Sequence, residues 1–269
     1  MKNYIISRYS AAGPCIGTAC CSPINRSGRF PKCTQIHSSM GLWMTVLPLF
    51  IIVSAIVCEY SGLDIWWESF FFNESTHSWP FRDHWLFEQV LHEGGRLFNI
   101  FAAGLWLLGF ITTLLHKPFR KYRKPMLYFL VAAAAGPIIV GALKQATHIY
   151  TPWDILPFYG SLPYIRLFDL VPNGLPIGQA FPAGHASGGY TFFSLYFLMH
   201  QLGASDKKLG LAAGLFLGGA YGLGQQVRGA HFPSHDLFSM VICWYAAFYV
   251  YYLFYPKQWR GLFNGSQHF

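Results

Sequence analysis

Six uncharged apolar runs alternate with polar segments along this chain, and they exclude an ordinary soluble fold. They cover residues 41–58, 97–115, 126–143, 186–202, 209–227 and 237–255. A helix of about 20 apolar residues crosses the hydrocarbon core of a bilayer. Only 11% of all residues are charged, compared with about 25% in soluble domains. The sequence therefore predicts an all-α polytopic membrane protein, with six transmembrane helices in one domain over residues 41–260.

Residues 1–40 have a different composition. They are rich in Ser, Gly and Pro and contain five Lys or Arg and no acid. We expect a disordered cytoplasmic tail, or sequence upstream of a start at Met40 or Met44. This segment holds four of the six cysteines, Cys15, Cys20, Cys21 and Cys33. Their spacing does not match paired C-x2-C zinc knuckles, so no metal site is predicted there.

Positive charge is distributed unevenly between the two sides that six spans define. The tail, the turns 116–125 and 203–208 and the C-terminus carry fourteen Lys or Arg, whereas segments 59–96, 144–185 and 228–236 carry five. Because cytoplasmic loops are enriched in Lys and Arg, we expect both termini in the cytoplasm of a bacterial inner membrane. The three less basic segments then lie on the periplasmic side. The first of them, acidic and aromatic, predicts an interfacial loop with short amphipathic helices.

Polar groups gather on that predicted periplasmic side. Lys144 ends the third run, the segment 181–187 (Phe-Pro-Ala-Gly-His-Ala-Ser) opens the fourth near a helix N-terminus, and Arg228 and His231 lie between the last two. A lone Lys or Arg at a span end is common, because it snorkels to the interface. Two histidines and an Ala-Gly turn need another explanation. Phosphoryl transfer uses cations, backbone N–H donors, a nucleophile and a proton donor, so we predict that these groups converge on one phosphate.

The order of these residues is similar to that of a known family. Lys144, then Pro182-Ala-Gly-His185, then Arg228 and His231-Phe-Pro-Ser-His235-Asp236 resemble the motifs K-x6-R-P, P-S-G-H and S-R-x5-H-x3-D. These belong to the type 2 phosphatidic acid phosphatases, which share a helical core with the vanadium haloperoxidases. The resemblance covers roughly residues 126–255.

The resemblance implies a role for each matching residue. His231 would be the nucleophile that forms a phosphohistidine, and His185 would be the general acid. Lys144 and the backbone amides of Ala183 and Gly184 would hold the phosphate. The resemblance implies no metal and no cofactor.

Several family positions carry other residues in this chain. Thr151 and Gln225 stand where the family has arginines, and Ala183 stands where it has Ser. We expect Arg228 to replace one arginine, and Arg166 is a candidate for the other. His235 stands at the family aspartate, with Asp236 next to it. Either could orient the His231 ring, and we favour Asp236 because a carboxylate also stabilises an imidazolium.

The sequence thus predicts a phosphatase that acts on a membrane lipid phosphate at the periplasmic face. Lipid A phosphate and polyprenyl diphosphate are the leading substrates, with phosphatidylglycerol phosphate and phosphatidic acid as further candidates. One alternative is phosphoryl transfer from His231 to a second lipid. Another is a non-catalytic scaffold or transporter that binds an anionic lipid. A metal site made by His185, His231, His235 and Asp236 is disfavoured, because Pro233 interrupts the helix that the i, i+4 histidines would need.

Overall fold

The computed structural model describes residues 40–257, with side chains from Met44 onward. The predicted tail before residue 40, with its four cysteines, and the chain after residue 257 lie outside the described residues. The helices are α1 (Met40–Tyr60), α2 (Leu63–Ser69), η1 (Leu86–Gly94), α3 (Gly95–Leu115), η2 (Lys117–Tyr122), α4 (Arg123–Lys144), η3 (Pro152–Asp154), η4 (Leu156–Phe158), α5 (Gly184–Tyr190), α6 (Phe193–Gln201), α7 (Lys208–Val227) and α8 (Pro233–Phe254). Within residues 40–257, β-type pairing is limited to two isolated bridges. The predicted all-helical fold is confirmed.

Three helical segments are long and apolar enough to cross a membrane, namely Leu86–Leu115, Lys117–Lys144 and Pro233–Phe254. Helices α1 and α2, bent by 70° at a short break, count as a fourth if they form one span. The fourth predicted run is divided between α5 and α6. The fifth forms α7, whose Gly and Gln residues lower its hydropathy. The structure therefore shows three to four candidate spans, and the number six stays a prediction.

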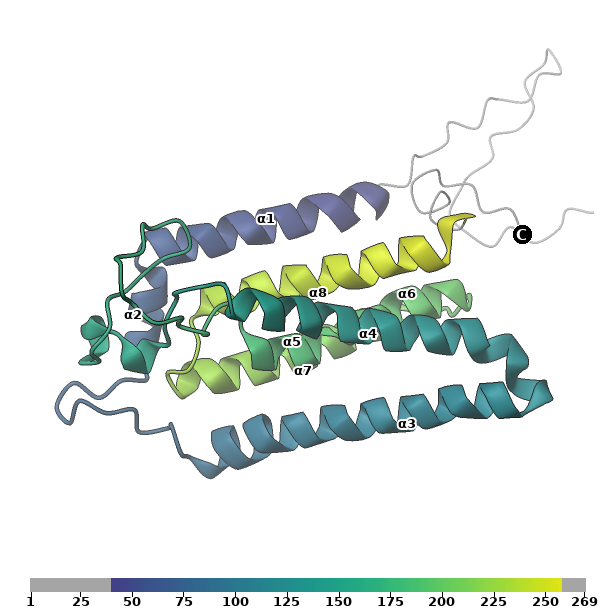
Figure 1. Ribbon diagram of the computed structural model, residues 1–269, viewed down its shortest axis with the longest axis horizontal. Helices are drawn as coiled ribbons and strands as arrows, with labels where there is room; N and C mark the ends of the chain where they lie inside the picture. Colours follow the sequence, from purple (N-terminus) through teal and green to yellow (C-terminus); the bar gives the residue numbers. More distant parts are fainter. Residues whose placement is uncertain (1–39, 258–269) are drawn as a thin grey trace, which may run out of the picture. The chain divides into compact units, whose positions relative to one another are not determined.

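Helices α4 and α8 lie side by side and run in opposite directions (Figure 1). The phenol of Tyr128, near the start of α4, donates a hydrogen bond of 3.4 Å to the carbonyl of Ala247, near the end of α8. Midway along the pair, Gly136 packs against Cys243. The antiparallel arrangement therefore brings the end of α4, where Lys144 lies, to the start of α8.

Glycine allows α7 to pack closely against α5 and α6. Gly218 of α7 lies against the ring of Tyr190, and Gly214 lies against Phe193. A side chain at either glycine would collide with these rings. Small residues at such contacts let membrane helices approach closely. This packing holds α5, which carries His185, against α7.

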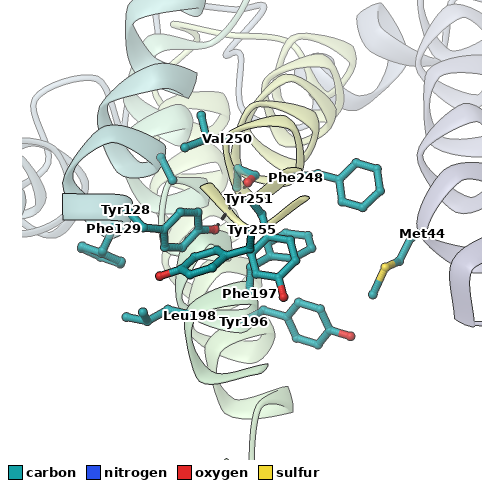
Figure 2. Close-up of a cluster of buried hydrophobic side chains, with 12 residues drawn as sticks. Met44, Tyr128, Phe129, Tyr196, Phe197, Leu198, Phe248, Val250, Tyr251 and Tyr255 are labelled. Carbon is teal, nitrogen blue, oxygen red and sulfur yellow. Dashed lines mark hydrogen bonds between the residues drawn. The ribbon is translucent and has the colours of Figure 1, made fainter. Parts of the chain in front are cut away.

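One end of the α4–α8 pair holds a dense aromatic cluster, shown in Figure 2. Tyr128, Phe197 and Tyr251 are almost fully buried in it. The ring of Tyr251 packs against Phe197 at a centroid distance of 5.5 Å, and its hydroxyl donates to Gln201 Oε1 at 3.3 Å. We call this cluster the aromatic end. It fixes how α4, α6 and α8 pack together.

The opposite end is covered by the two long polar segments. A second buried cluster there holds the loops together and consists of Phe72, Tyr150, Ile155, Phe158, Ile165 and Phe232. Phe232 directly precedes α8, so the loops pack onto the residue that begins this helix. The segment 144–185, which we call the connector loop, therefore shares a hydrophobic core with Phe72 and Phe232.

Candidate active site

The residues predicted to bind phosphate meet where α4 ends and α5 begins. Lys144 is the last residue of α4, and Gly184 is the first of α5. A Cβ atom at Gly184 would lie 3.3 Å from Nζ of Lys144. The ammonium group therefore lies beside the Ala-Gly turn, and a side chain at position 184 would require Lys144 to shift slightly.

His231 is a buried residue just before α8. Its ring faces that of His235 at a centroid distance of 5.9 Å. Among the described residues, neither Nδ1 atom has a hydrogen-bond partner, and the Ala180 carbonyl accepts a hydrogen bond from His231. Burial lowers the pKa of His231 well below its ordinary value, and the nearby charge of Lys144 lowers this pKa further. His231 is therefore neutral at pH 7 and keeps one nitrogen lone pair available.

The structure places His235, rather than Asp236, beside the His231 ring. The Asp236 carboxylate faces α7, where it accepts a hydrogen bond from Gln226 Nε2. Gln226 in turn accepts one of 2.9 Å from the indole N–H of Trp67. The family position that carries aspartate is thus occupied by the residue that contacts His231. The prediction that Asp236 orients His231 was made from chemistry alone, without knowing in which direction each side chain points from α8.

His185 lies in the first turn of α5, in contact with a segment that the sequence motifs do not include. Its Nε2 atom is 3.1 Å from the carbonyl oxygen of Leu91, and its ring packs against His92 and Tyr221. Burial lowers the pKa of His185, while the hydrogen bond to Leu91 opposes this change. A charge on His185 also lowers the pKa of His231, so the two rings are within electrostatic range of each other.

Arg228 is close to His185, but its guanidinium already has protein partners. It forms an ion pair with Glu88. Its Nε donates to the carbonyl of Arg82 at 2.8 Å, and Nη1 donates to Gln225 Oε1 at 3.1 Å. Arg228 therefore anchors the loop and η1 to α7 in this structure. The predicted phosphate contact requires a change in this arrangement.

Glu88 and His92 were not among the functional residues predicted from the sequence. Both lie on η1, a π-helix, and wide turns of this kind are frequent at functional sites. Their i, i+4 spacing, next to a Glu93 carboxylate, was the only signal in the sequence, and it precedes the motif region. Gln225 was noted only because it stands where the family has an arginine. In the structure its side chain accepts a hydrogen bond from Arg228, the residue expected to supply that charge.

The two amides predicted to bind phosphate differ in their availability. The Ala183 N–H donates to the carbonyl of His235 at 3.3 Å, so it is already used. The Ala183 carbonyl accepts from Ser239 Oγ at 2.9 Å. These bonds tie the turn before α5 to α8, and of the two predicted amides only that of Gly184 is left as a candidate phosphate donor.

Among residues 40–257, the arginine of the first motif has no replacement in the histidine cluster. Thr151, where the family has arginine, donates its hydroxyl hydrogen bond to Asp154. Arg166, the suggested replacement, pairs with Asp169 at 2.9 Å and lies over the ring of Tyr60. The Arg166 hydrogen bond lowers the pKa of Asp169. This pair therefore belongs to the connector loop and not to the histidine cluster.

Three acidic residues at the start of the predicted interfacial segment, Glu59, Asp64 and Glu68, are buried, whereas Glu74, Asp83 and Glu93 are exposed. Asp64 of α2 accepts hydrogen bonds from the backbone N–H and the hydroxyl of Ser234, at 3.2 and 2.5 Å. Asp64 therefore caps the start of α8. Glu68, one turn further along α2, is fully buried and interacts electrostatically with Asp64 and Asp236.

One group of possible metal ligands is found within the described residues. Glu88, His92 and Glu93 offer atoms that lie within 4.8 Å of one another. Glu88 is already paired with Arg228, and Glu93 is largely exposed. Within residues 40–257, the atoms of His185, His231, His235 and Asp236 do not come close enough together to form such a group. We therefore assign no metal to either set.

The fold and the site together define a helical membrane protein with a lysine and histidines that suit phosphate chemistry. The chain belongs to the PAP2 superfamily, whose family model matches residues 125–259, half of its length. Membership implies phosphatase-type activity on phosphate esters. Neither the curated proteins nor the solved structures contain a match to this chain.

Proposed function

We propose that this protein is an integral-membrane phosphatase that hydrolyses a lipid phosphate monoester or diphosphate through a phosphohistidine. One observation carries the proposal: the Lys144 ammonium lies beside Gly184 and near the buried imidazoles of His231 and His235. In the described part of the chain, the Nδ1 atoms of both rings have no hydrogen-bond partner. Such groups suit a phosphate, because preorganised donors stabilise the charge that develops on its oxygens.

His231 supplies the nucleophile. One of its ring nitrogens attacks phosphorus as the bond to the leaving oxygen breaks, and His185 gives its proton to that oxygen. Water then attacks the phosphohistidine and transfers a proton to His185, which releases inorganic phosphate and restores both rings. The low pKa of His231 supports the first step, because only the neutral imidazole has a lone pair.

The remaining residues position the phosphate and the nucleophile. Lys144 and the Gly184 amide bind the phosphoryl oxygens. His235 orients His231, with Asp236 as the alternative. Arg228 joins the phosphate only if the substrate competes with Glu88 for its guanidinium.

The site lies on the periplasmic face of a single membrane domain, residues 41–260, in this proposal. Six crossings place both termini in the cytoplasm of the bacterial inner membrane. The distribution of Lys and Arg supports this orientation. The lipid tail lies among the spans while its phosphate reaches Lys144, and lipid A or a polyprenyl diphosphate is the proposed substrate.

A non-catalytic protein that binds anionic lipids is the competing function, and one observation favours it. Arg228 and the Ala183 amide are both engaged by other groups of the protein. A site with fewer free donors binds a phosphate without necessarily stabilising its transition state.

Phosphate release from purified protein in detergent with excess chelator decides between these functions. The substrates are lipid A, a polyprenyl diphosphate, phosphatidylglycerol phosphate and phosphatidic acid, each with and without a second lipid as acceptor. His231→Ala is the test variant. His200→Ala, on α6, is the control because His200 packs against Tyr251 of the aromatic end.

Release that survives chelation and disappears only in His231→Ala supports the phosphatase. Transfer of phosphate to the acceptor lipid instead of water identifies a phosphotransferase. Lipid binding without release by folded wild-type protein supports the scaffold and rejects catalysis.

A further inference from the structure

An apolar cavity of about 370 Å³ lies among α1, α6, α7 and α8. Its walls include Ile51 of α1, Phe193 of α6, Leu211 of α7 and Trp244 of α8. The indole N–H of Trp244 donates a hydrogen bond of 3.1 Å to the Met44 carbonyl, so α1 is held against α8 at this wall. The volume lies in the range of small-ligand sites.

This cavity is separate from the candidate active site. It adjoins the first turns of α7, from Lys208 to Leu215. Arg228 follows the opposite end of α7, and a helix of this length extends over about 30 Å. A molecule whose polar group lies at Lys207 and Lys208 therefore cannot place that group at His231 or Lys144.

The charged residues that line the cavity are Lys207 and Lys208, and no acid lines it. Lys208 is exposed, whereas Lys207 is half-buried with its Nζ 3.3 Å from Nδ1 of His200. The neighbouring Asp206 accepts a hydrogen bond from Ser205 and is not part of the lining. The cavity thus combines an apolar wall with positive charge at one end.

We propose that this cavity binds an anionic phospholipid. The acyl chain lies against Leu211 and Trp244, and the head-group phosphate pairs with Lys207 and Lys208. Basic pockets between membrane helices bind anionic head groups, and each Lys near such a surface adds to the attraction. The charge selects an anionic lipid over a zwitterionic one, and the length of α7 makes this lipid distinct from the substrate.

The test uses the full chain in phosphatidylcholine nanodiscs. One sample contains a trace of photoactivatable phosphatidylglycerol, and the other contains phosphatidylcholine with the same reactive acyl chain. Labelled peptides are mapped by mass spectrometry. We expect the anionic probe to label the segments 44–51, 207–215 and 240–244 about tenfold more than the zwitterionic probe.

Three variants distinguish the effect of the lysine charges on lipid binding from the effect of the cavity volume. Lys207→Gln with Lys208→Gln should remove the preference for the anionic probe. Leu211→Trp should fill the cavity and lower labelling by both probes. Ile51→Trp fills it from α1 and serves if the first filling variant does not fold. The control, Lys117→Gln with Lys121→Gln, removes two charges from another basic turn that does not line the cavity.

Equal labelling by the two probes would overturn the proposal, because the lysines would then select nothing. A control pair that lowers labelling as much as the cavity pair would also overturn it. So would cross-links between two copies of the chain at these segments, since a second protein would then fill the cavity. Loss of the preference in the cavity pair alone supports it.

Discussion

The two ends of the α4–α8 pair are both buried, yet they are built on different principles. At the aromatic end the phenols of Tyr128 and Tyr251 pack among rings and donate to Ala247 and Gln201. At the other end, Lys144 lies near His231 and His235, whose Nδ1 atoms have no partner in the described part of the chain. Buried polar groups normally have partners. The hydroxyl of Tyr255 at the aromatic end has no partner among the described residues either, so the two ends differ in the kind of buried group: phenols at one end, and a lysine with imidazoles at the other. That difference in chemistry is why we propose the second end, the histidine end, as the phosphate site.

His231→Ala should cause the largest loss of activity, and its effect should be confined to the histidine end, where Lys144, His231 and His235 lie. Loss of a nucleophile lowers kcat by several orders of magnitude, roughly 10⁴-fold or more. The change removes no packing from the aromatic end, so the thermal unfolding midpoint should move little. Phosphate release and unfolding in detergent are measured on the same preparation. Retention of a tenth of the activity would reject His231 as the nucleophile.

Tyr251→Ala should lower stability and leave activity nearly unchanged, the reverse of His231→Ala. It removes a fully buried ring from the aromatic end, and truncation of a large core side chain costs about 3–5 kcal/mol. We expect a marked fall in the unfolding midpoint, with kcat per folded molecule nearly unchanged. Tyr251→Phe is the matched control, because it keeps the ring and removes only the hydroxyl. A large loss of kcat in folded Tyr251→Ala would show that the two ends are coupled.

Lys144→Ala should lower kcat/KM by about 10²–10³-fold, as expected when one donor to a developing charge is lost. Lys144→Arg keeps the positive charge but enlarges the group beside Gly184, so it should recover only part of the activity. Steady-state kinetics on one lipid phosphate measure both. If both variants match the wild type, the ammonium group does not contact the phosphate.

Ser234→Ala tests whether the histidine end can lose stability without losing activity. The change removes a contact that supports the start of α8 and leaves every proposed site residue in place. It deletes the hydroxyl bond to Asp64 and should lower stability by about 1 kcal/mol, as for other helix caps. Activity should fall less than threefold, a rough bound from the same free energy. The unfolding midpoint and kcat are compared with those of Ser205→Ala, whose hydroxyl lies in an exposed turn. An unchanged midpoint would show that the hydrogen bond from the Ser234 hydroxyl to Asp64 does not stabilise the fold.

The pH profile should show the smallest effect. The proton donor His185 must be protonated, and burial lowers its pKa from the ordinary 6.5. Activity is therefore lost as pH rises through a value below 6.5. His231 must be neutral, and its still lower pKa keeps the acid limb at lower pH. The dependence of kcat/KM on pH reports these free-enzyme groups. An alkaline limb above 7 would argue against this role for His185.

The sequence predicted the helical class because apolar runs are a strong signal, and it predicted the meeting of Lys144 with Gly184. It did not predict the orientation of side chains around α8. His235 and Asp236 are adjacent in the chain, but successive residues on a helix point about 100° apart, so one faces His231 and the other α7. A choice between them on chemical grounds alone favoured the carboxylate.

The partners of Arg228 and His185 could not be predicted for a different reason. Glu88 and His92 come from η1, far from the motifs in the chain, and a packed fold alone brings them to the site. The burial of Asp64 and Glu68 was hidden because acids beside aromatic residues are typical of membrane interfaces. Only the bend after α1 reveals that α2 turns inward.

That bend has a consequence for how the site is assembled. Asp64 and Ser234 are 170 residues apart, so the cap that starts α8 joins two helices that are distant in the chain. Until α8 packs against α2, Asp64 lacks the two hydrogen-bond donors of Ser234, and His231, just before α8, has no fixed position. The proposed site is therefore completed only when α8 packs against α2.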